Sequence, residues 1–181
     1  MVVETAIREQ LLATIPSLRA FAISLCGNPD RADDLVQDTL MKAWSHMDRF
    51  ERGTNLNAWL FTILRNGFFS EHRKRVREVE DGDGSYAATL TTAPDQLSHL
   101  DFDDLRRALL KLPADQREAV LLVGAQGFSY EDAAGICGCA VGTIKSRVNR
   151  ARSRLAELLS LDTEGDLASD SLFMAALQLA A

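Results

Sequence analysis

Apolar residues recur every three or four positions through most of this 181-residue chain, and no segment shows the sustained apolar–polar alternation of a strand. Such spacing gathers the apolar side chains on one face of an α-helix. It is clearest at Leu35, Val36, Thr39, Leu40, Ala43, Trp44 and Met47, and again at Leu56, Leu60, Ile63, Leu64 and Gly67. Further helices are expected at about 4–14, 16–26, 98–111 and 114–125, with Pro16 and Pro113 at helix starts. The sequence therefore predicts an all-α protein.

The expected helices fall into two groups, separated by an acidic stretch without helical periodicity. From Glu80 to Gln96 the residues are mostly polar or small and include two glycines and one proline, which is typical of a linker. We therefore predict two small helical domains, at 1–79 and 98–160, joined by a flexible acidic linker at 80–97. An acidic and apolar tail at 161–181 follows them.

The formal net charge of −6 conceals an uneven distribution of charge. Residues 79–104 carry seven acidic residues and residues 160–181 carry four, and neither segment has a Lys or Arg. Residues 105–159, by contrast, carry nine basic and five acidic residues. The acidic total thus belongs to the linker and the tail, and it does not argue against nucleic-acid binding by the second domain.

Several classes of protein are disfavoured by what the sequence contains. No apolar run approaches the roughly 18 to 20 residues of a membrane span, and the N-terminus lacks the pattern of a secretion signal. The three cysteines lack the spacing of a zinc site. Isolated histidines and scattered carboxylates offer no nucleophile–base pair. We expect a cytoplasmic protein that is not an enzyme and has no cofactor, metal, membrane partner or small-molecule substrate.

The second domain contains the pattern of a helix-turn-helix. Ser129 to Asp132 form an N-cap signature, after which a short helix is expected to end near Ile136. The turn Cys137-Gly138-Cys139 follows, and a longer basic helix begins near Ala140. A short helix, a glycine turn and a longer helix together indicate this DNA-binding motif.

The basic helix has three kinds of side chain on three faces. Ile144, Val148, Ala151 and Leu155 form the stripe expected to face the core, and Gly142, Ser146, Asn149 and Ser153 lie opposite. Arg147, Arg150 and Arg154 lie on one flank, and Lys145 and Arg152 on the other. Small polar residues can enter the major groove while cations reach the phosphates. A solvated helix with charge near its C-terminus explains the cations alone equally well, but the capped helix and turn before it favour DNA binding.

The first domain offers two exposed faces. Asp34, Gln37, Asp38 and Met41 share one face, which is either simply solvated or docks a basic partner helix. On the helix after the loop 49–58, Trp59, Asn66, Ser70, Arg73 and Arg77 lie on one side. Aromatic, amide and guanidinium groups suit an unpaired nucleic-acid strand. Taken alone, however, these residues slightly favour a packed Trp59 with solvated arginines.

Five segments, in order, resemble bacterial extracytoplasmic function (ECF) sigma factors over about residues 10–158. They are DDLVQDTLMKAW (33–44), FERGTNLNAWLFTILRN (50–66), HRKR (72–75), LPADQREAVLL (112–122) and FSYEDAAGICGCAVGTIKSRVNRARSRL (128–155). The segment LRAFAISLCGNPDRADDLVQDTL (18–40) most resembles the sigma factors of the general stress response, a subgroup of this family. The resemblance implies that the first half is a σ2 domain and the second a σ4 domain. Cys137 and Cys139 around the turn, and the small Gly142, depart from the family pattern, so base choice at the −35 element cannot be transferred.

The resemblance also implies partners and site residues. The partner would be core RNA polymerase, through its β′ clamp helices and its β flap. Asp34, Gln37, Asp38 and Met41 on the helix that binds the clamp helices would be the polymerase-binding residues. The −10 element would be bound and opened by Phe50, Gly53, Thr54, Asn55, Asn57, Trp59, Asn66, Arg73, Lys74 and Arg77. The −35 element would be read by Gly142, Thr143, Lys145, Ser146, Arg147, Asn149, Arg150 and Arg154. The function implied is promoter recognition and DNA opening, for stress-response genes, under the control of a small anti-sigma factor.

Two other functions fit parts of the sequence. A sigma-like adaptor that mimics a sigma factor and never touches DNA would tolerate loss of the basic residues, yet Asn66, Arg147 and Arg150 are all present. A dimeric helix-turn-helix repressor would leave the first 78 residues without a role. Both are therefore weaker hypotheses than a sigma factor.

Overall fold

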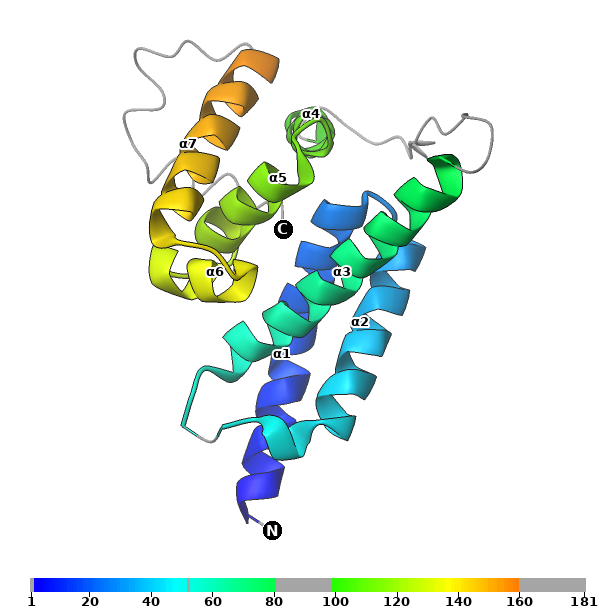
Figure 1. Cartoon of the computed structure of the whole chain (residues 1–181), viewed down its shortest axis with the longest axis vertical. Helices are drawn as coiled ribbons and strands as arrows, with labels where there is room; N and C mark the ends of the chain where they lie inside the picture. The colour runs from blue at the N-terminus through cyan, green and yellow to red at the C-terminus, as the bar shows by residue number, and fades with distance from the viewer. Residues whose placement is uncertain (1, 52, 81–98, 160–181) are drawn as a thin grey trace. The chain divides into compact units, whose positions relative to one another are not determined.

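The computed structural model describes residues 2–51, 53–80 and 99–159, and these residues form seven α-helices and no strand (Figure 1). The chain divides into two compact units, Met1–Ala93 and Pro94–Ala181, each described here by itself. The predicted all-α class and the two helical domains are thereby confirmed. The structure does not describe residues 81–98 and 160–181, which include nearly all of the linker predicted at 80–97 and the whole tail predicted at 161–181. The properties of the linker and the tail, and the exact domain limits, therefore stay predictions.

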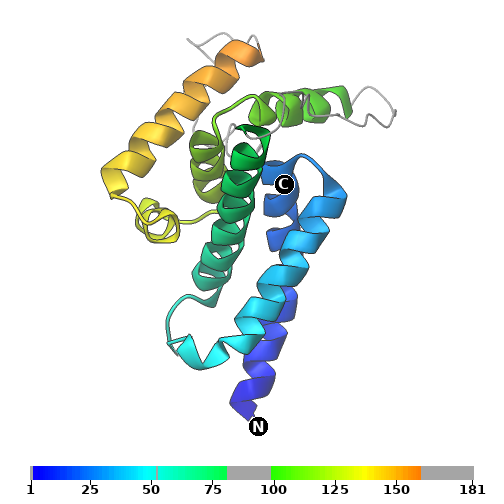
Figure 2. The ribbon, with the colours of Figure 1, turned by 45° about the vertical axis from the view of Figure 1, so that its right-hand side comes forward.

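Three long helices make the first unit: α1 (Val2–Cys26), α2 (Pro29–Ser45) and α3 (Leu56–Glu80), with a 3₁₀ turn at Met47–Arg49 before α3. Each runs opposite to the one before it, as Figures 1 and 2 both show. The rings of Phe21 and Phe61 meet in the core with their centroids 5.1 Å apart. Gly67 lets α3 approach α2 closely, because a Cβ there would lie 3.0 Å from Cδ1 of Leu35.

The predicted break between residues 14 and 16 is wrong, because α1 is continuous with Pro16 inside it. A proline in a helix interior costs about 3 kcal/mol, since it removes one backbone hydrogen bond and crowds the preceding turn. Leu11, before the proline, and Leu18, after it, are both buried in the same core. Burial of apolar residues on both sides offsets the cost, since tertiary packing supplies most helix stability in proteins.

The connection from α1 to α2 follows its sequence signals. Gly27 adopts a left-handed φ of +70°, and the side chain of Asn28 accepts a hydrogen bond from the backbone N–H of Arg31 at 3.0 Å. Across the two helices, Arg19 donates from Nε to Asp33 at 2.6 Å, and this hydrogen bond holds the pKa of the Asp33 carboxyl below its ordinary value. Local turn chemistry thus fixes the junction between α1 and α2.

The second unit contains α4 (His99–Leu110), α5 (Ala114–Val120), α6 (Tyr130–Cys137) and α7 (Val141–Leu158). The helix expected at 114–125 is present in extent, but Leu121–Ala125 form a π-helical turn, in which the N–H of Gln126 donates to the carbonyl of Leu121 at 3.0 Å. All the helices of the unit contribute to its core, and the wholly buried side chains of the π-helical turn and of α7 include Leu121, Leu122, Ile144 and Leu155. Packing against this core fixes the position of α7 within the unit.

No helix among the described residues has the length and apolar character to cross a membrane.

Candidate functional site

One face of α2 is exposed and mixes acidic and apolar side chains. Asp34, Gln37, Asp38 and Met41 are all exposed, as their shared face predicts, while Leu35, Val36, Thr39 and Ala43 are buried on the opposite side. Trp44 was expected on the buried stripe, and this expectation is wrong, because 66% of its surface is exposed. At about 100° per residue, Trp44 lies only about 20° around the helix from Gln37. We call Asp34, Gln37, Asp38, Met41 and Trp44 the α2 surface.

The loop between the 3₁₀ turn and α3 has a defined backbone. Gly53 has a φ of +93°, a conformation that favours glycine, and both it and Thr54 are exposed. Thr54 donates from its hydroxyl and its N–H to the carbonyl of Glu51, at 2.7 and 3.2 Å. The side chain of Asn55 caps α3 by accepting from the N–H of Ala58 at 3.2 Å. The loop therefore presents Gly53 and Thr54 while Asn55 is used in capping.

Two further residues of this region contact neighbouring side chains. The hydroxyl of Thr14 on α1 lies 2.8 Å from Oδ1 of Asn57 and donates to it. The ring of Trp59 is partly buried against Phe50, with centroids 5.2 Å apart. Asn57 and the Phe50–Trp59 pair thus hold the base of the loop, and whether they also contact DNA stays a prediction.

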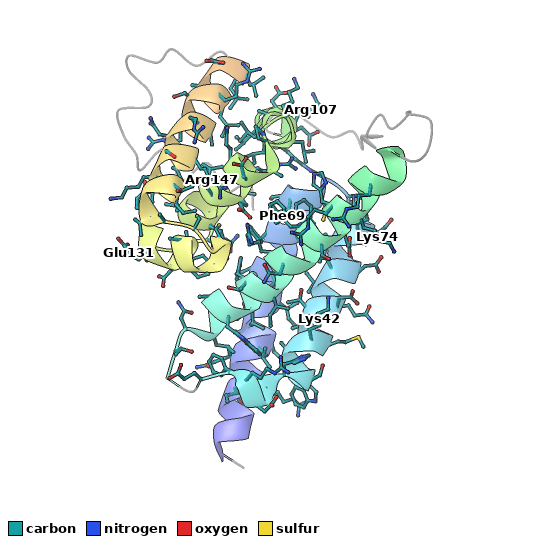
Figure 3. The ribbon with its side chains drawn as sticks, in the orientation of Figure 1. Lys42, Phe69, Lys74, Arg107, Glu131 and Arg147 are labelled. Carbon is teal, nitrogen blue, oxygen red and sulfur yellow. The ribbon has the colours of Figure 1, made fainter. Side chains whose placement is uncertain are left out.

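The exposed side of α3 carries the remaining predicted residues of this site. Asn66, Arg73, Lys74 and Arg77 are exposed, and Figure 3 shows Lys74 on the later turns of α3. Oδ1 of Asn66 accepts from the guanidinium of Arg65 at 3.4 Å. An amide and a series of cations therefore follow one helix from the loop toward its C-terminus, an arrangement that suits a single strand running along it.

The helix-turn-helix is present with both of its predicted caps. Ser129 accepts from the N–H of Asp132 at 3.0 Å and donates to its carboxylate at 2.8 Å. Gly138 ends α6 in the left-handed conformation, and the N–H of Cys139 donates to the carbonyl of Ala134 at 3.1 Å. This six-residue closure is a Schellman motif, which fixes the direction of the chain as it enters α7.

On α7, the predicted buried stripe and the predicted exposed face opposite it are confirmed. Ile144, Val148, Ala151 and Leu155 are buried, and Gly142, Ser146, Asn149 and Ser153 are exposed. Lys145 lies with its Nζ 5.7 Å from the centre of the Tyr130 ring on α6. Arg150 is exposed and donates to the backbone carbonyl and hydroxyl of Ser146, each at 3.3 Å. A small polar face bordered by cations is therefore available to a major groove.

Two predicted cations of α7 make ion pairs within the unit. Arg154 pairs with Glu157 at 2.7 Å, and both side chains are more than half exposed. Arg147 is only 21% exposed and lies toward α5, where it approaches Asp115 at 3.2 Å and the wholly buried Glu118 at 3.6 Å (Figure 3). The sequence reasoning missed this pairing. The one signal available was a glutamate directly before the apolar run 119–123.

The described residues contain no group of three or more His, Cys, Asp or Glu side chains placed to hold a metal ion.

Comparison with known proteins matches both units to one family. Residues 12–78 match the model of Sigma-70 region 2, and residues 102–155 match that of Sigma-70, region 4. The chain is 66% identical over 165 residues to the ECF RNA polymerase sigma factor EcfG of Rhodopseudomonas palustris (strain TIE-1), with 91% of each chain covered.

Solved structures give the same result at the level of the fold. The sigma factor RpoE, in its complex with the anti-sigma factor NepR from Bartonella quintana, matches with a TM-score of 0.80 and 61% identity, covering 87% of this chain and 98% of that one. The complex of the anti-anti-sigma factor PhyR with NepR from the same organism matches with a TM-score of 0.56 at 17% identity, covering 83% and 49%. The second likeness shows the fold alone.

Regions 2 and 4 in order, together with two-thirds identity over most of the chain, place the protein in the family of ECF sigma factors, non-catalytic initiation factors that bind core RNA polymerase and direct promoter recognition.

Proposed function

We propose that this sigma factor acts in the cytoplasm, where it directs RNA polymerase to the promoters of stress-response genes through three separate surfaces. The assignment to stress response is supported by the 66% identity to EcfG and by the 61% identity to RpoE in its complex with NepR. A small anti-sigma factor comparable to NepR is the corresponding partner.

The α2 surface is the proposed docking site for core polymerase. It combines exposed carboxylates at Asp34 and Asp38 with the exposed side chains of Met41 and Trp44. Carboxylates select a basic partner helix, and aromatic and methionine side chains are enriched in protein interfaces. A helical face of this composition is better suited to binding the β′ clamp helices than to being merely solvated.

The loop from Phe50 to Asn57 and the exposed side of α3 are the proposed site for the opened −10 element. Gly53 is exposed and has no side chain to cover the backbone of the loop, so an extruded base can approach it there. Asn66, Arg73, Lys74 and Arg77 continue from there along one side of the helix. The capped base of the loop supplies the rigidity that such a site requires.

Helix α7 is the proposed reader of the −35 element, and the observation that carries this proposal is its exposed face. Gly142, Ser146 and Asn149 give a shallow polar surface without large side chains, and Lys145 and Arg150 stand at its two edges. A sigma-like adaptor that never touches DNA would have no use for this arrangement. The match to the anti-anti-sigma factor PhyR, at 17% identity, shows a shared fold alone.

Transcription in vitro with core polymerase tests both DNA sites. Asn66→Ala is expected to slow strand opening, measured by permanganate reactivity of unpaired thymines, with closed-complex binding unchanged. Arg150→Ala is expected to weaken closed-complex binding by roughly tenfold, since a good base or phosphate contact contributes about 1–3 kcal/mol. Arg106→Ala on α4 is the matched control, because Arg106 is exposed outside the helix-turn-helix. Full activity of both test variants would contradict the assignment of these surfaces.

A further inference from the structure

Arg147 differs from the other cations of α7 that border the exposed face. Its side chain is 21% exposed, against 57% for Arg154, and it points toward α5 (Figure 3). Nε lies 3.2 Å from Oδ2 of Asp115, and a terminal nitrogen lies 3.6 Å from Oε1 of Glu118. The same terminal nitrogen lies 3.9 Å from Sγ of Cys139 in the turn before α7. The guanidinium of Arg147, which is a residue of α7, thus contacts both α5 and the turn before α7.

The burial of Glu118 makes this contact matter for folding. Its side chain has no exposed surface, and an isolated carboxylate in such a position is penalised by several kcal/mol. The guanidinium of Arg147 beside it lowers that penalty, so this contact contributes to the stability of the unit. Because Asp115 approaches the same guanidinium, two carboxylates face one positive charge. The charge of Arg147 is therefore already neutralised within the protein.

The position of Arg147 along α7 determines what such an anchor controls. It lies one residue after Ser146 and two before Asn149, both of which are exposed. An anchor at this point resists rotation of α7 about its own axis, and a rotation of one residue position would turn the exposed face by about 100°. The contact between Arg147 and Cys139 also resists a change in the angle between the turn and α7.

We propose that Arg147 is a positioning residue, which fixes the rotational setting of α7 on α5 through Asp115 and Glu118 and does not serve as a phosphate contact. This inference rests on the proposed reading of the −35 element by α7. It also revises the sequence-based grouping of Arg147 with Arg150 as equivalent DNA contacts.

The salt dependence of promoter binding separates the two roles. A cation that contacts a phosphate releases a counterion, so its loss lowers the slope of log affinity against log salt by about 0.9. The experiment measures binding of the full-length holoenzyme to a promoter fragment over a series of KCl concentrations. Arg150→Gln is expected to lower both the affinity and the slope. Arg147→Gln is expected to lower the affinity by roughly tenfold, about 1.4 kcal/mol, while leaving the slope unchanged.

Substitution of the two carboxylates on α5 provides a second test. The direction of the change in DNA affinity distinguishes a positioning role for Arg147 from a phosphate contact. Asp115→Asn and Glu118→Gln each remove a negative charge, so simple electrostatics predicts tighter binding to DNA. Positioning predicts weaker binding, because the anchor of Arg147 is lost. The double variant Arg147→Gln/Glu118→Gln should lose less affinity than the product of the two single losses, since both act through one contact.

Circular dichroism and thermal unfolding establish that each variant is folded. If Arg147→Gln does not fold, Asp115→Asn carries the test, because that side chain is 45% exposed and its loss is milder. A fall in slope for Arg147→Gln equal to that for Arg150→Gln, or tighter binding by Asp115→Asn, overturns the inference. If Arg150→Gln changes neither affinity nor slope, the proposed DNA-reading role of α7 fails instead.

Discussion

Trp44 exposes 66% of its surface on α2, beside Met41 with 63% exposed. An indole of this exposure adds little to the stability of the first unit, because few of its atoms leave water on folding. In an interface the same ring supplies a large apolar area with few rotatable bonds. Its place at the end of the α2 surface therefore favours a role in binding rather than in folding.

Substitution of Trp44 by Ala tests that role. We expect the affinity for core polymerase to fall by roughly tenfold or more, because truncated aromatic anchors cost above 1 kcal/mol in interfaces. The free energy of unfolding should change by no more than about 0.5 kcal/mol. Leu12→Ala is the matched control, since Leu12 is 56% exposed on α1. Equal losses for the two variants, measured by competition for labelled core polymerase, would point to nonspecific apolar contact.

Exposure of single residues could be predicted where helical periodicity decides it. The buried stripe Ile144, Val148, Ala151 and Leu155 follows directly from spacing. Arg147 could not be placed this way, because its carboxylate partners are about 30 residues earlier and only tertiary packing brings them together. Trp44 was wrongly assigned to the buried stripe because it is hydrophobic, although its angle around the helix places it near Gln37 on the exposed face.

At the scale of elements, the turn between α6 and α7 depends on Gly138. Its φ of +63° is a conformation that other L-residues adopt at a cost, although the space around its Cα is open. Gly135 lies inside α6, where it is exposed and a Cβ would meet nothing within 4 Å. The two glycines therefore differ in backbone conformation and not in crowding.

Alanine at each glycine should have opposite effects on stability. Gly138→Ala is expected to destabilise the second unit by about 1–2 kcal/mol, the cost of a left-handed alanine. Gly135→Ala should stabilise it by up to about 1 kcal/mol, because alanine is the better helix former. Chemical denaturation of the full chain, followed by circular dichroism, measures both. Destabilisation by both variants would show that α6 is more crowded than its open surroundings indicate.

The elements themselves were predictable where local chemistry determines them. Ser129 as a cap, the glycine turn and the junction at Asn28 and Pro29 all follow from short-range signals. The continuity of α1 through Pro16 did not, since burial on both sides of the proline outweighs its local preference. The π-helical turn at Leu121–Ala125 also lacks a sequence signal. Such a turn holds one residue more than an α-helical turn, and the apolar residues in it look the same in sequence as those of an ordinary buried helix.

At the scale of the whole molecule, the protein has two units and no strongly positive total charge. Even the basic part, residues 105–159, has only nine Lys and Arg against five Asp and Glu, and the guanidinium groups of Arg147 and Arg154 already face carboxylates. Nonspecific attraction to DNA depends on uncompensated cations, so the free protein has little of it. Each proposed DNA surface is also small, and two weak sites gain affinity only when they are presented together.

The free chain is therefore expected to bind a −35/−10 promoter duplex weakly, without specific binding at nanomolar concentration. Addition of core polymerase should produce specific binding to the same fragment. Fluorescence anisotropy with a scrambled promoter of equal length as control measures both states. Nanomolar, sequence-specific binding by the protein alone would contradict this expectation and show that its own surfaces suffice.

Pro16 has a consequence for how disturbances spread through the first unit. It supplies no N–H for the carbonyl of Leu12, so the backbone ladder of α1 lacks one rung there. Because that hydrogen bond is missing, unwinding the turns before Pro16 breaks one backbone hydrogen bond fewer than it would in an uninterrupted helix. Thr14 lies beside the gap and bonds to Asn57. A disturbance of the N-terminal turns of α1 therefore has a direct route, through Thr14, to Asn57 at the base of the loop that we propose binds the −10 element.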